Sequence, residues 1–329
     1  MKVLLTGATG FLGRHVAQDL LSHGFAVRAL VRDRHAKLPA GAEAVETRFD
    51  NPTELDTIVR GVDAVLHLAG KVSRDPKDTS EMYWLHVEAT RMLLCSMERV
   101  GVRRLVLAST SGTLALTDRE GYVSSERDQP PFPIIGKFPY YLSKLYQEQE
   151  VSRWDRAEKI DAVILNPSLC LGPGDERLSS TDDVLKLLLG QIPVATSGTV
   201  AFVDVRDAAP AFRFALEKGK RGERYLLNGA NMSVRTFAER VATAGGVSPP
   251  SLKMSDRLAV FSAKVLDGVY RTADRIPPID PVSVEMSRYN WGCSSEKAER
   301  QLGFRARDPQ STIRDTVRYL EERGLFRRV

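Results

Sequence analysis

The sequence predicts an α/β fold in which helices cover both faces of a doubly wound parallel sheet. In the first half of the 329 residues, short β-rich runs alternate with longer runs of helical periodicity. A glycine-rich loop, TGATGFLG, follows directly after the first β-rich run. Repeated strand–helix units favour a parallel sheet, because each helix carries the chain back across one face. The pattern is less regular after residue 165, which predicts a smaller, mostly helical C-terminal lobe.

Glycine and proline mark the element boundaries in the first half. Gly24, Gly61 and Gly101 each follow a helical run and are typical helix stops. Pro52 and Pro139 suit a first helical turn, where the missing N–H costs nothing. The expected strands are Lys2–Leu5, Ala26–Val31, Ala64–Leu68, Arg104–Ala108 and Asp161–Leu165. The expected helices are Gly10–His23, Pro52–Arg60, Ser80–Val100 and one that follows Pro139.

The second half contains two further β-rich runs, which we expect to return to the same sheet: Val200–Val203 and Tyr225–Leu227. Helical patterns lie around them at Thr181–Gly190, Asp207–Glu217, Val234–Thr243, Ser294–Leu302 and Thr312–Glu322. We therefore expect one domain over residues 1–165, with return segments near 200–230. Residues 166–199 and 231–329 would form the second lobe.

Composition excludes several classes of protein. No apolar run approaches the ~20 residues that span a bilayer, so we expect no integral membrane segment. Cys95, Cys170 and Cys293 are too far apart for a disulfide framework or zinc site, which favours a cytoplasmic protein without a metal. The net charge is +5, but the basic residues are scattered, so nucleic acid is not an expected partner.

The glycine loop has the spacing of a dinucleotide-binding turn between a strand and a helix. Gly7 allows the tight turn, Gly10 lets the backbone approach a pyrophosphate, and Gly13 lets helix and strand pack closely. The helix N-terminus then offers N–H groups to the phosphates. This context predicts a Rossmann-type domain. The expected contacts are Gly7, Thr9, Gly10, Phe11, Leu12 and Gly13.

The end of the second predicted strand bears on the choice of cofactor. It reads Val31-Arg32-Asp33-Arg34. The Arg32 guanidinium is suited to a ribose 2′-phosphate, whereas Asp33 keeps ribose hydroxyls as an alternative. The alternative to a cofactor contact is that this stretch forms a solvated charged loop. We expect NADP(H) to be preferred, with NAD(H) possible.

The stretch FPYYLSK places Tyr140 and Lys144 one helical turn apart. A free phenol, with a pKa near ~10, holds its proton too tightly to act as a base at neutral pH. A neighbouring ammonium favours the phenolate and lowers that pKa. We therefore predict that Tyr140 is an acid/base whose pKa Lys144 lowers. A packed tyrosine beside a solvated lysine is the simpler alternative.

These motifs, in this order, resemble the extended short-chain dehydrogenase/reductase family, also called the NAD-dependent epimerase/dehydratase family. The closest resemblance is to ketoreductase and hydroxysteroid dehydrogenase members. HLAG (His67–Gly70) resembles the family's cofactor wall, and NPSLCLGPGD (Asn166–Asp175) resembles its nicotinamide segment. LASTSGT (Leu107–Thr113) resembles the strand with the catalytic hydroxyl. The resemblance implies cofactor contacts at Asp50, Leu68, Ala69, Gly70, Tyr140, Lys144, Asn166 and Pro167. It places Thr110 in the catalytic position, with Ser109 and Ser111 as alternatives.

One residue departs from the family pattern. His86 stands where the family often has an asparagine that holds a proton-relay water. It either replaces that asparagine or is a packing histidine.

The resemblance implies an NADP(H)-dependent oxidoreductase that moves hydride between nicotinamide and a carbonyl or secondary alcohol. The expected substrate is a moderately apolar small molecule. A nucleotide-sugar 4-epimerase or dehydratase with bound NAD is the enzyme alternative, and a non-catalytic dinucleotide sensor is the alternative from another class. The family also suggests a possible homodimer.

Two later segments can shape a substrate cleft. Leu258, Phe261, Val265, Leu266 and Val269 have helical spacing. This stripe predicts a packed core helix, or one that caps an apolar substrate or touches a membrane. The proline- and charge-rich segment 118–138 is expected to overhang the cleft as a lid.

Overall fold

The computed structural model describes residues 1–252, 254–272 and 280–327. Its main sheet has seven parallel strands in the order β3-β2-β1-β4-β5-β6-β9. The order reverses between β1 and β4, which is where Rossmann folds open a crevice for ligands. The strands are β1 (Lys2–Thr6), β2 (Ala26–Val31), β3 (Glu43–Glu46), β4 (Ala64–His67), β5 (Arg104–Ala108), β6 (Asp161–Pro167) and β9 (Arg224–Leu227). The predicted fold class is confirmed.

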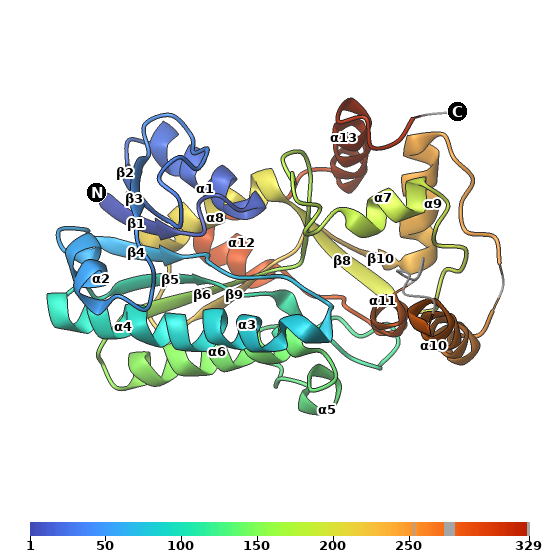
Figure 1. Ribbon diagram of the computed structural model, residues 1–329, viewed down its shortest axis with the longest axis horizontal. Coiled ribbons are helices and arrows are strands. Elements are labelled where there is room, and N and C mark those ends of the chain that lie inside the picture. The colour runs from blue at the N-terminus through green and yellow to red at the C-terminus, as the bar shows by residue number, and fades with distance from the viewer. Residues whose placement is uncertain (253, 273–279, 328–329) are drawn as a thin grey trace.

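Helices cover both faces of the main sheet (Figure 1). Side chains alternate along each strand, so that Val106 packs in the core under α1 and α8 while Leu107 packs in the core under α2 and α4. On the first face lie α1 (Phe11–Ser22), α8 (Val205–Lys218) and α12 (Glu296–Leu302), and on the second lie α2 (Pro52–Val59), α4 (Ala89–Val100) and α6 (Pro139–Arg156).

A second, three-stranded sheet has the order β10-β8-β7. Its strands are β7 (Leu169–Leu171), β8 (Thr199–Asp204) and β10 (Ala230–Ser233). The expectation that the run at 200–203 returns to the main sheet is therefore wrong, because β8 pairs with β7 and β10 instead. Around this sheet lie α7 (Asp182–Leu188), α9 (Val234–Gly245), α10 (Asp256–Thr272), α11 (Pro281–Ser287) and α13 (Pro309–Glu322).

The helix expected at 80–100 contains a widened turn. It runs as α3 (Thr79–Tyr83), a π-helical turn (Trp84–Glu88) and then α4. Such turns change which side chains face a neighbouring element and are frequent at functional sites. A short helix, α5 (Phe132–Ile135), precedes α6.

No helix within the described residues is both long enough and apolar enough to cross a bilayer.

Candidate active site

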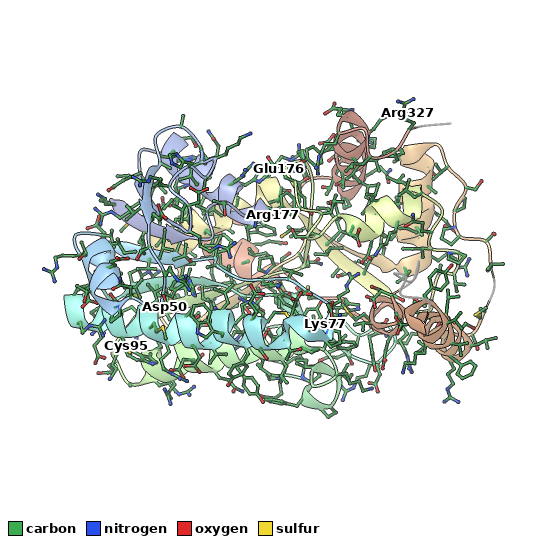
Figure 2. All side chains as sticks on the ribbon, in the orientation of Figure 1. Asp50, Lys77, Cys95, Glu176, Arg177 and Arg327 are labelled. Atoms are coloured by element: carbon green, nitrogen blue, oxygen red, sulfur yellow. The ribbon has the colours of Figure 1, made fainter. Side chains whose placement is uncertain are left out.

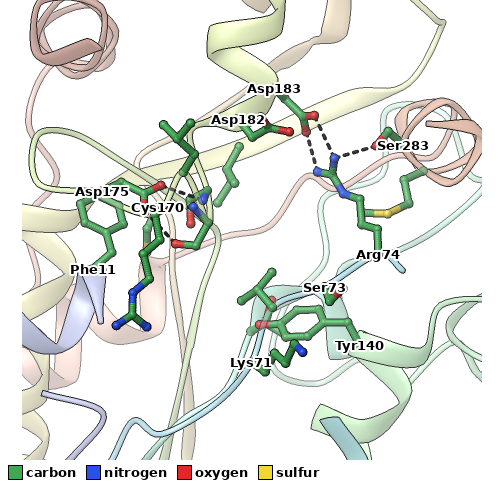
Figure 3. Close-up of a pocket in the computed structure, with 18 of the residues that line it drawn as sticks. Phe11, Lys71, Ser73, Arg74, Tyr140, Cys170, Asp175, Asp182, Asp183 and Ser283 are labelled. Carbon is green, nitrogen blue, oxygen red and sulfur yellow. Dashed lines mark hydrogen bonds and ion pairs between the residues drawn. The ribbon is translucent and has the colours of Figure 1, made fainter. Parts of the chain in front are cut away.

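A cleft with a volume of about 1860 Å³ runs from the carboxyl ends of β1, β2 and β4 into the second lobe. Its walls come from the loops after these strands, from the start of α6, and from helices around the small sheet. In Figure 3, Tyr140 and Arg74 lie on one side of the opening, and Phe11 and Cys170 lie on the other. The cleft is therefore long enough to join a cofactor site to a substrate site.

The glycine loop has a backbone that a larger residue would disrupt. Gly7 has φ +76°, and a Cβ atom there would lie 2.5 Å from the carbonyl carbon of Leu68. A Cβ atom at Gly13 would overlap the carbonyl oxygen of Gly7. Gly10 precedes α1, whose first turn has no side-chain cap and no acidic residue. These exposed N–H groups fit a pyrophosphate. All six loop residues predicted to bind the cofactor line the cleft: Gly7, Thr9, Gly10, Phe11, Leu12 and Gly13.

Cationic side chains from the loop after β2 line the far end of the cleft. Arg32 and Lys37 line it and are exposed. Within the described residues, no hydrogen bond or ion pair engages the Arg32 guanidinium. Asp33 also lines the cleft, and its carboxylate accepts the His35 backbone N–H at 2.9 Å. This end of the cleft therefore offers an unpaired guanidinium to an anionic group.

Asp50 does not join this group. It is exposed beside α2 and pairs with Arg48 at 3.3 Å (Figure 2). Thr47, Arg48 and Phe49 line the cleft in its place. The sequence motif identified the correct loop, but the loop backbone turns Asp50 away from the cleft.

The segment after β4 forms one wall of the cleft, as predicted for Leu68, Ala69 and Gly70, which all line it. The hydroxyl oxygen of Thr6 accepts the backbone N–H groups of Leu68 (3.2 Å) and Ala69 (3.0 Å). The Thr6 hydroxyl proton is then available for Nδ1 of His67 at 2.7 Å. Burial lowers the pKa of His67 to about 3, so this histidine is neutral and structural.

A chain of hydrogen bonds leads from this wall to Lys144. Both Nε2 of His67 (2.9 Å) and the amide nitrogen of Gln147 (2.8 Å) donate to the Thr90 hydroxyl. Gln147 accepts from the Lys144 ammonium through its Oε1, and Lys144 also donates to the Ala108 carbonyl at 2.7 Å. Burial lowers the pKa of Lys144 to about 8. An ammonium has three donors, so one remains for a ligand.

His86, in the π-helical turn, bonds at both ring nitrogens. The Lys71 backbone N–H donates to its Nε2 at 3.1 Å, so the ring proton sits on Nδ1 and donates to Ser143 at 2.8 Å. Ser143 in turn donates to the Tyr140 carbonyl at 2.8 Å. Burial lowers the pKa of His86 to about 2. Because both nitrogens are engaged within the chain, the geometry favours the packing interpretation over a water-holding one.

The Tyr140 phenol lines the cleft and is half-buried. Its ring lies 5.0 Å from that of Tyr141 and 5.9 Å from that of His86, measured between centroids. Burial raises the pKa of Tyr140, and the nearby Tyr141 and Cys170 raise it further. The expectation that Lys144 lowers this pKa is not met by the side chains present, because the ammonium is directed to Ala108 and Gln147. The resting phenol is therefore protonated.

The three hydroxyls after β5 face different ways. Ser109 donates to Glu148 of α6 and is thereby occupied. Thr110 has extended backbone (φ −149°, ψ 147°), so its side chain leaves the sheet on the face opposite Ser109. The Thr110 hydroxyl accepts the Gly112 N–H at 3.3 Å. Ser111 begins a short 3₁₀ turn (Ser111–Thr113), so strand alternation ends there. This turn packs against the start of α6, where a Cβ atom at Gly112 would overlap the Tyr141 ring. All three hydroxyl-bearing residues line the cleft.

Asn166 supports this turn from behind. It is fully buried, and its Nδ2 lies within hydrogen-bonding distance of the Thr110 carbonyl (3.0 Å), the Thr113 hydroxyl (3.1 Å) and Glu148 (2.7 Å). It does not line the cleft, whereas its neighbour Pro167 does.

An ion pair joins the cofactor half to the second lobe. Arg74, from the loop after β4, binds Asp183 of α7 at 2.8 and 2.5 Å and Ser283 of α11 at 2.6 Å (Figure 3). Burial opposes ionisation of Asp183, but the Arg74 guanidinium holds the pKa of that carboxyl below its usual range. Sequence reasoning missed Arg74, because no local pattern marks a contact between residues more than 100 positions apart.

The substrate end of the cleft is largely apolar, and sequence reasoning anticipated little of it. Its lining includes Phe138, Val200, Phe237, Ala263, Leu266 and Met286. The helical spacing of apolar residues in α10 was the only feature of the sequence that indicated this apolar lining. Of the segment 118–138, only Lys137 and Phe138 line the cleft. Isolated β-bridges join Thr117, just before this segment, to Asn290, and Ser124 within it to Cys293. The segment therefore does not form a lid over the cleft.

Comparison with known proteins places these features in a family. Residues 3–227 match the family model described as "NAD dependent epimerase/dehydratase family". The chain is 30% identical to a putative dihydroflavonol 4-reductase of Synechocystis, over 97% of this chain and 94% of that one. It is 28% identical to sterol demethylase protein B of Methylococcus capsulatus, over 99% and 100% respectively.

Among solved structures, a UDP-glucose 4-epimerase of Thermus thermophilus in complex with NAD has the same fold. The TM-score is 0.75 at 22% identity, over 98% of this chain and 99% of that one. Together with the glycine cradle and the Tyr140–Lys144 helix, these matches show that the chain belongs to the NAD-dependent epimerase/dehydratase family, the extended short-chain dehydrogenases/reductases, and is an NAD(P)-dependent oxidoreductase.

Proposed function

We propose that this protein transfers hydride between NADP(H) and a carbonyl or secondary alcohol of an apolar, ring-containing small molecule. The observation that carries the proposal is one continuous cleft. A glycine cradle with an uncapped helix lies at one end, an apolar chamber at the other, and the Tyr140 phenol faces the passage between them.

The cofactor would lie along the lining residues from Gly7 to Arg32, with its pyrophosphate at the start of α1. A bound nicotinamide dinucleotide supplies or accepts the hydride. The third donor of Lys144 is left for a ribose hydroxyl. The unpaired Arg32, with Lys37 beside it on the lining, favours the extra phosphate of NADP(H) over the plain ribose of NAD(H).

Tyr140 is the proton donor when a carbonyl is reduced. Its raised pKa keeps the phenol protonated before reaction, so the proton is present when negative charge develops on the substrate oxygen. The Lys144 ammonium, one turn further along α6, is held by Ala108 and Gln147 and acts through its third donor on the cofactor ribose beside Tyr140. His86 and Ser143 hold the backbone of Tyr140, so we assign them positioning roles.

The family resemblance assigned to Thr110 the hydroxyl that orients the substrate oxygen. Ser111 lines the cleft in the 3₁₀ turn that packs against the start of α6, next to Tyr140, and we assign this role to Ser111. Thr110 then closes the turn through its bond to Gly112.

The apolar side chains of the chamber favour a hydrophobic substrate over a nucleotide sugar, whose diphosphate needs charged partners. Two cations on the lining, Arg74 and Lys186, are already paired with Asp183 and Asp182. The named relatives agree with this choice, because one is a putative dihydroflavonol reductase and another is a sterol demethylase component.

The test is a panel of cyclic ketones, with NADPH and NADH, followed by nicotinamide absorbance. We expect oxidation of NADPH by ring-containing ketones and a higher KM with NADH. Turnover of a UDP-sugar with tightly retained NAD would instead make the protein an epimerase. Cofactor binding without turnover on any carbonyl or sugar would favour the sensor interpretation.

A further inference from the structure

Helix α10 is apolar on two faces. Ala259, Ala263 and Leu266 point to the cleft and line it. On the outside, four large apolar side chains share one face of the helix at intervals of three and four residues. They are Leu258 (50% exposed), Phe261 (65%), Val265 (51%) and Val269 (58%). One helix diameter, about 10 Å, therefore separates the apolar chamber from an apolar outer surface.

The charges exposed beside this stripe are cationic. On the described part of α10, the exposed charged side chains are Arg257 and Lys264, and both border the apolar stripe on the same side. Among the described residues, Lys264 has one ion pair, a long one to Glu285 at 3.9 Å. The acids of the helix sit further in: Asp256 is half-buried and holds Ser197, and Asp267 is half-buried. An apolar face with a basic border is the pattern of a helix that lies in a membrane interface.

The place of α10 in the fold suits this role. Figure 1 shows α10 and α11 at the end of the molecule far from β1–β3, so a surface that binds α10 lies apart from the cofactor end of the cleft. Leu252, just before α10, lines the cleft and is also 53% exposed.

A second copy of the chain fits the patch less well than a lipid surface. The four outer side chains together expose roughly 400 Å², about half of the ~800 Å² per partner that stable interfaces bury. In a two-fold dimer with antiparallel α10 helices, the basic borders would also face each other, and like charges repel.

We propose that α10 docks on an anionic membrane surface, so that the cleft behind it receives its apolar substrate from the lipid. The docking goes beyond the proposed reductase function and does not require it. Only the delivery of substrate rests on that function.

The docking experiment is sedimentation with vesicles of phosphatidylcholine, with and without phosphatidylglycerol. Wild type should sediment with the phosphatidylglycerol vesicles and be released by salt. The double variant F261S/V265S should bind at least about tenfold more weakly, because it loses two apolar side chains from the contact. R257Q/K264Q should lose the preference for phosphatidylglycerol. The matched control is Leu189→Ser, which removes a similarly exposed side chain (47%) at the end of α7 and should bind as wild type does.

Several results would overturn the docking proposal. These are no sedimentation of wild type, equal binding by F261S/V265S, or a wild-type dimer that becomes a monomer in that variant without any vesicle binding. Circular dichroism of each variant separates loss of docking from loss of folding.

Substrate delivery has its own measurement. F261S/V265S should reduce a water-soluble ketone at the wild-type rate but reduce a vesicle-borne ketone about tenfold more slowly. Equal rates on the vesicle-borne ketone would refute delivery. Vesicle binding without turnover of any ketone would refute the reductase function and leave docking intact.

Discussion

The two ends of the cleft are built in different ways. At the cofactor end, short motifs and local hydrogen bonds position the lining, as in the Thr6–His67–Thr90 chain behind the wall after β4. At the substrate end, the lining comes from segments far apart in the sequence, and Arg74 reaches across to Asp183 and Ser283. The first end depends on a few exact residue types, whereas the second depends on how whole helices are placed.

This difference predicts how each end responds to mutation. A change in the cofactor end should remove catalysis or alter cofactor choice without moving the fold. A change in the substrate end should alter KM for the substrate and leave the chemistry in place.

The largest effect is expected at Tyr140. Tyr140→Phe removes the proton donor, so kcat should fall by about 10³-fold while NADPH binding stays near wild type. Steady-state kinetics and fluorescence titration of NADPH measure the two quantities. Tyr141→Phe is the matched control, since it loses a neighbouring hydroxyl and should retain most activity. Near-normal kcat in Tyr140→Phe would exclude this tyrosine as the acid/base.

The next largest effect distinguishes Ser111 from Thr110, the two cleft-lining hydroxyl residues after β5 that do not bond to Glu148. Ser111→Ala should lower kcat about 100-fold, because the substrate oxygen loses a hydrogen-bond donor. Thr110→Val should lower it much less, since the Thr110 hydroxyl serves the turn. The opposite order in kcat would return the catalytic role to Thr110, as the sequence motif first suggested.

Cofactor choice should depend on Arg32. Arg32→Glu should raise KM for NADPH about tenfold or more and leave KM for NADH nearly unchanged, because only NADPH carries the 2′-phosphate. Arg34→Glu is the control, since Arg34 pairs with Glu46 outside the cleft. An unchanged ratio of the two KM values in Arg32→Glu would contradict the assignment.

A smaller effect, visible as a pH shift, is expected at Gln147. The ammonium form of Lys144 is the active one, so kcat/KM should fall as pH rises through its pKa of about 8. Gln147→Glu places a carboxylate beside this ammonium and favours the charged form. The falling limb should then move up by about one pH unit. Gln147→Leu removes the acceptor and should move the limb down. Gln149→Leu, on the exposed side of α6, should leave it in place, and a common limb in all four proteins would refute the link.

The smallest effect is expected for the bridge between the two ends. Arg74→Met should raise KM for an apolar ketone a few-fold, because α7 and α11 lose their common anchor on the loop after β4. The loss of stability should be modest, since the side chains of the pair keep about one third of their surface exposed and water can solvate Asp183 when Arg74 is removed. Lys71→Met is the control, because among the described residues the Lys71 ammonium pairs only with Asp78 and Glu81, near its own loop. Equal KM values would show that the bridge does not shape the substrate end.

Most of the main sheet could be predicted from the sequence, because each strand is a short apolar run and each helix ends at a glycine or begins at a proline. The same local reasoning missed β3, β7 and β10, which have three or four residues and gain their stability from neighbours distant in sequence. It also assigned β8 to the wrong sheet, since the sequence pattern of a strand does not identify the strand with which it pairs.

The candidate site divides in the same way. The glycine spacing and the Tyr140–Lys144 interval determine which residues can lie together, because backbone freedom and helical periodicity are local properties. Only the tertiary structure turned Asp50 away from the cleft, packed the turn that begins at Ser111 against the start of α6, and bonded both nitrogens of His86. It also left one face of α10 exposed, because burial and hydrogen-bond partners depend on which distant segments pack together.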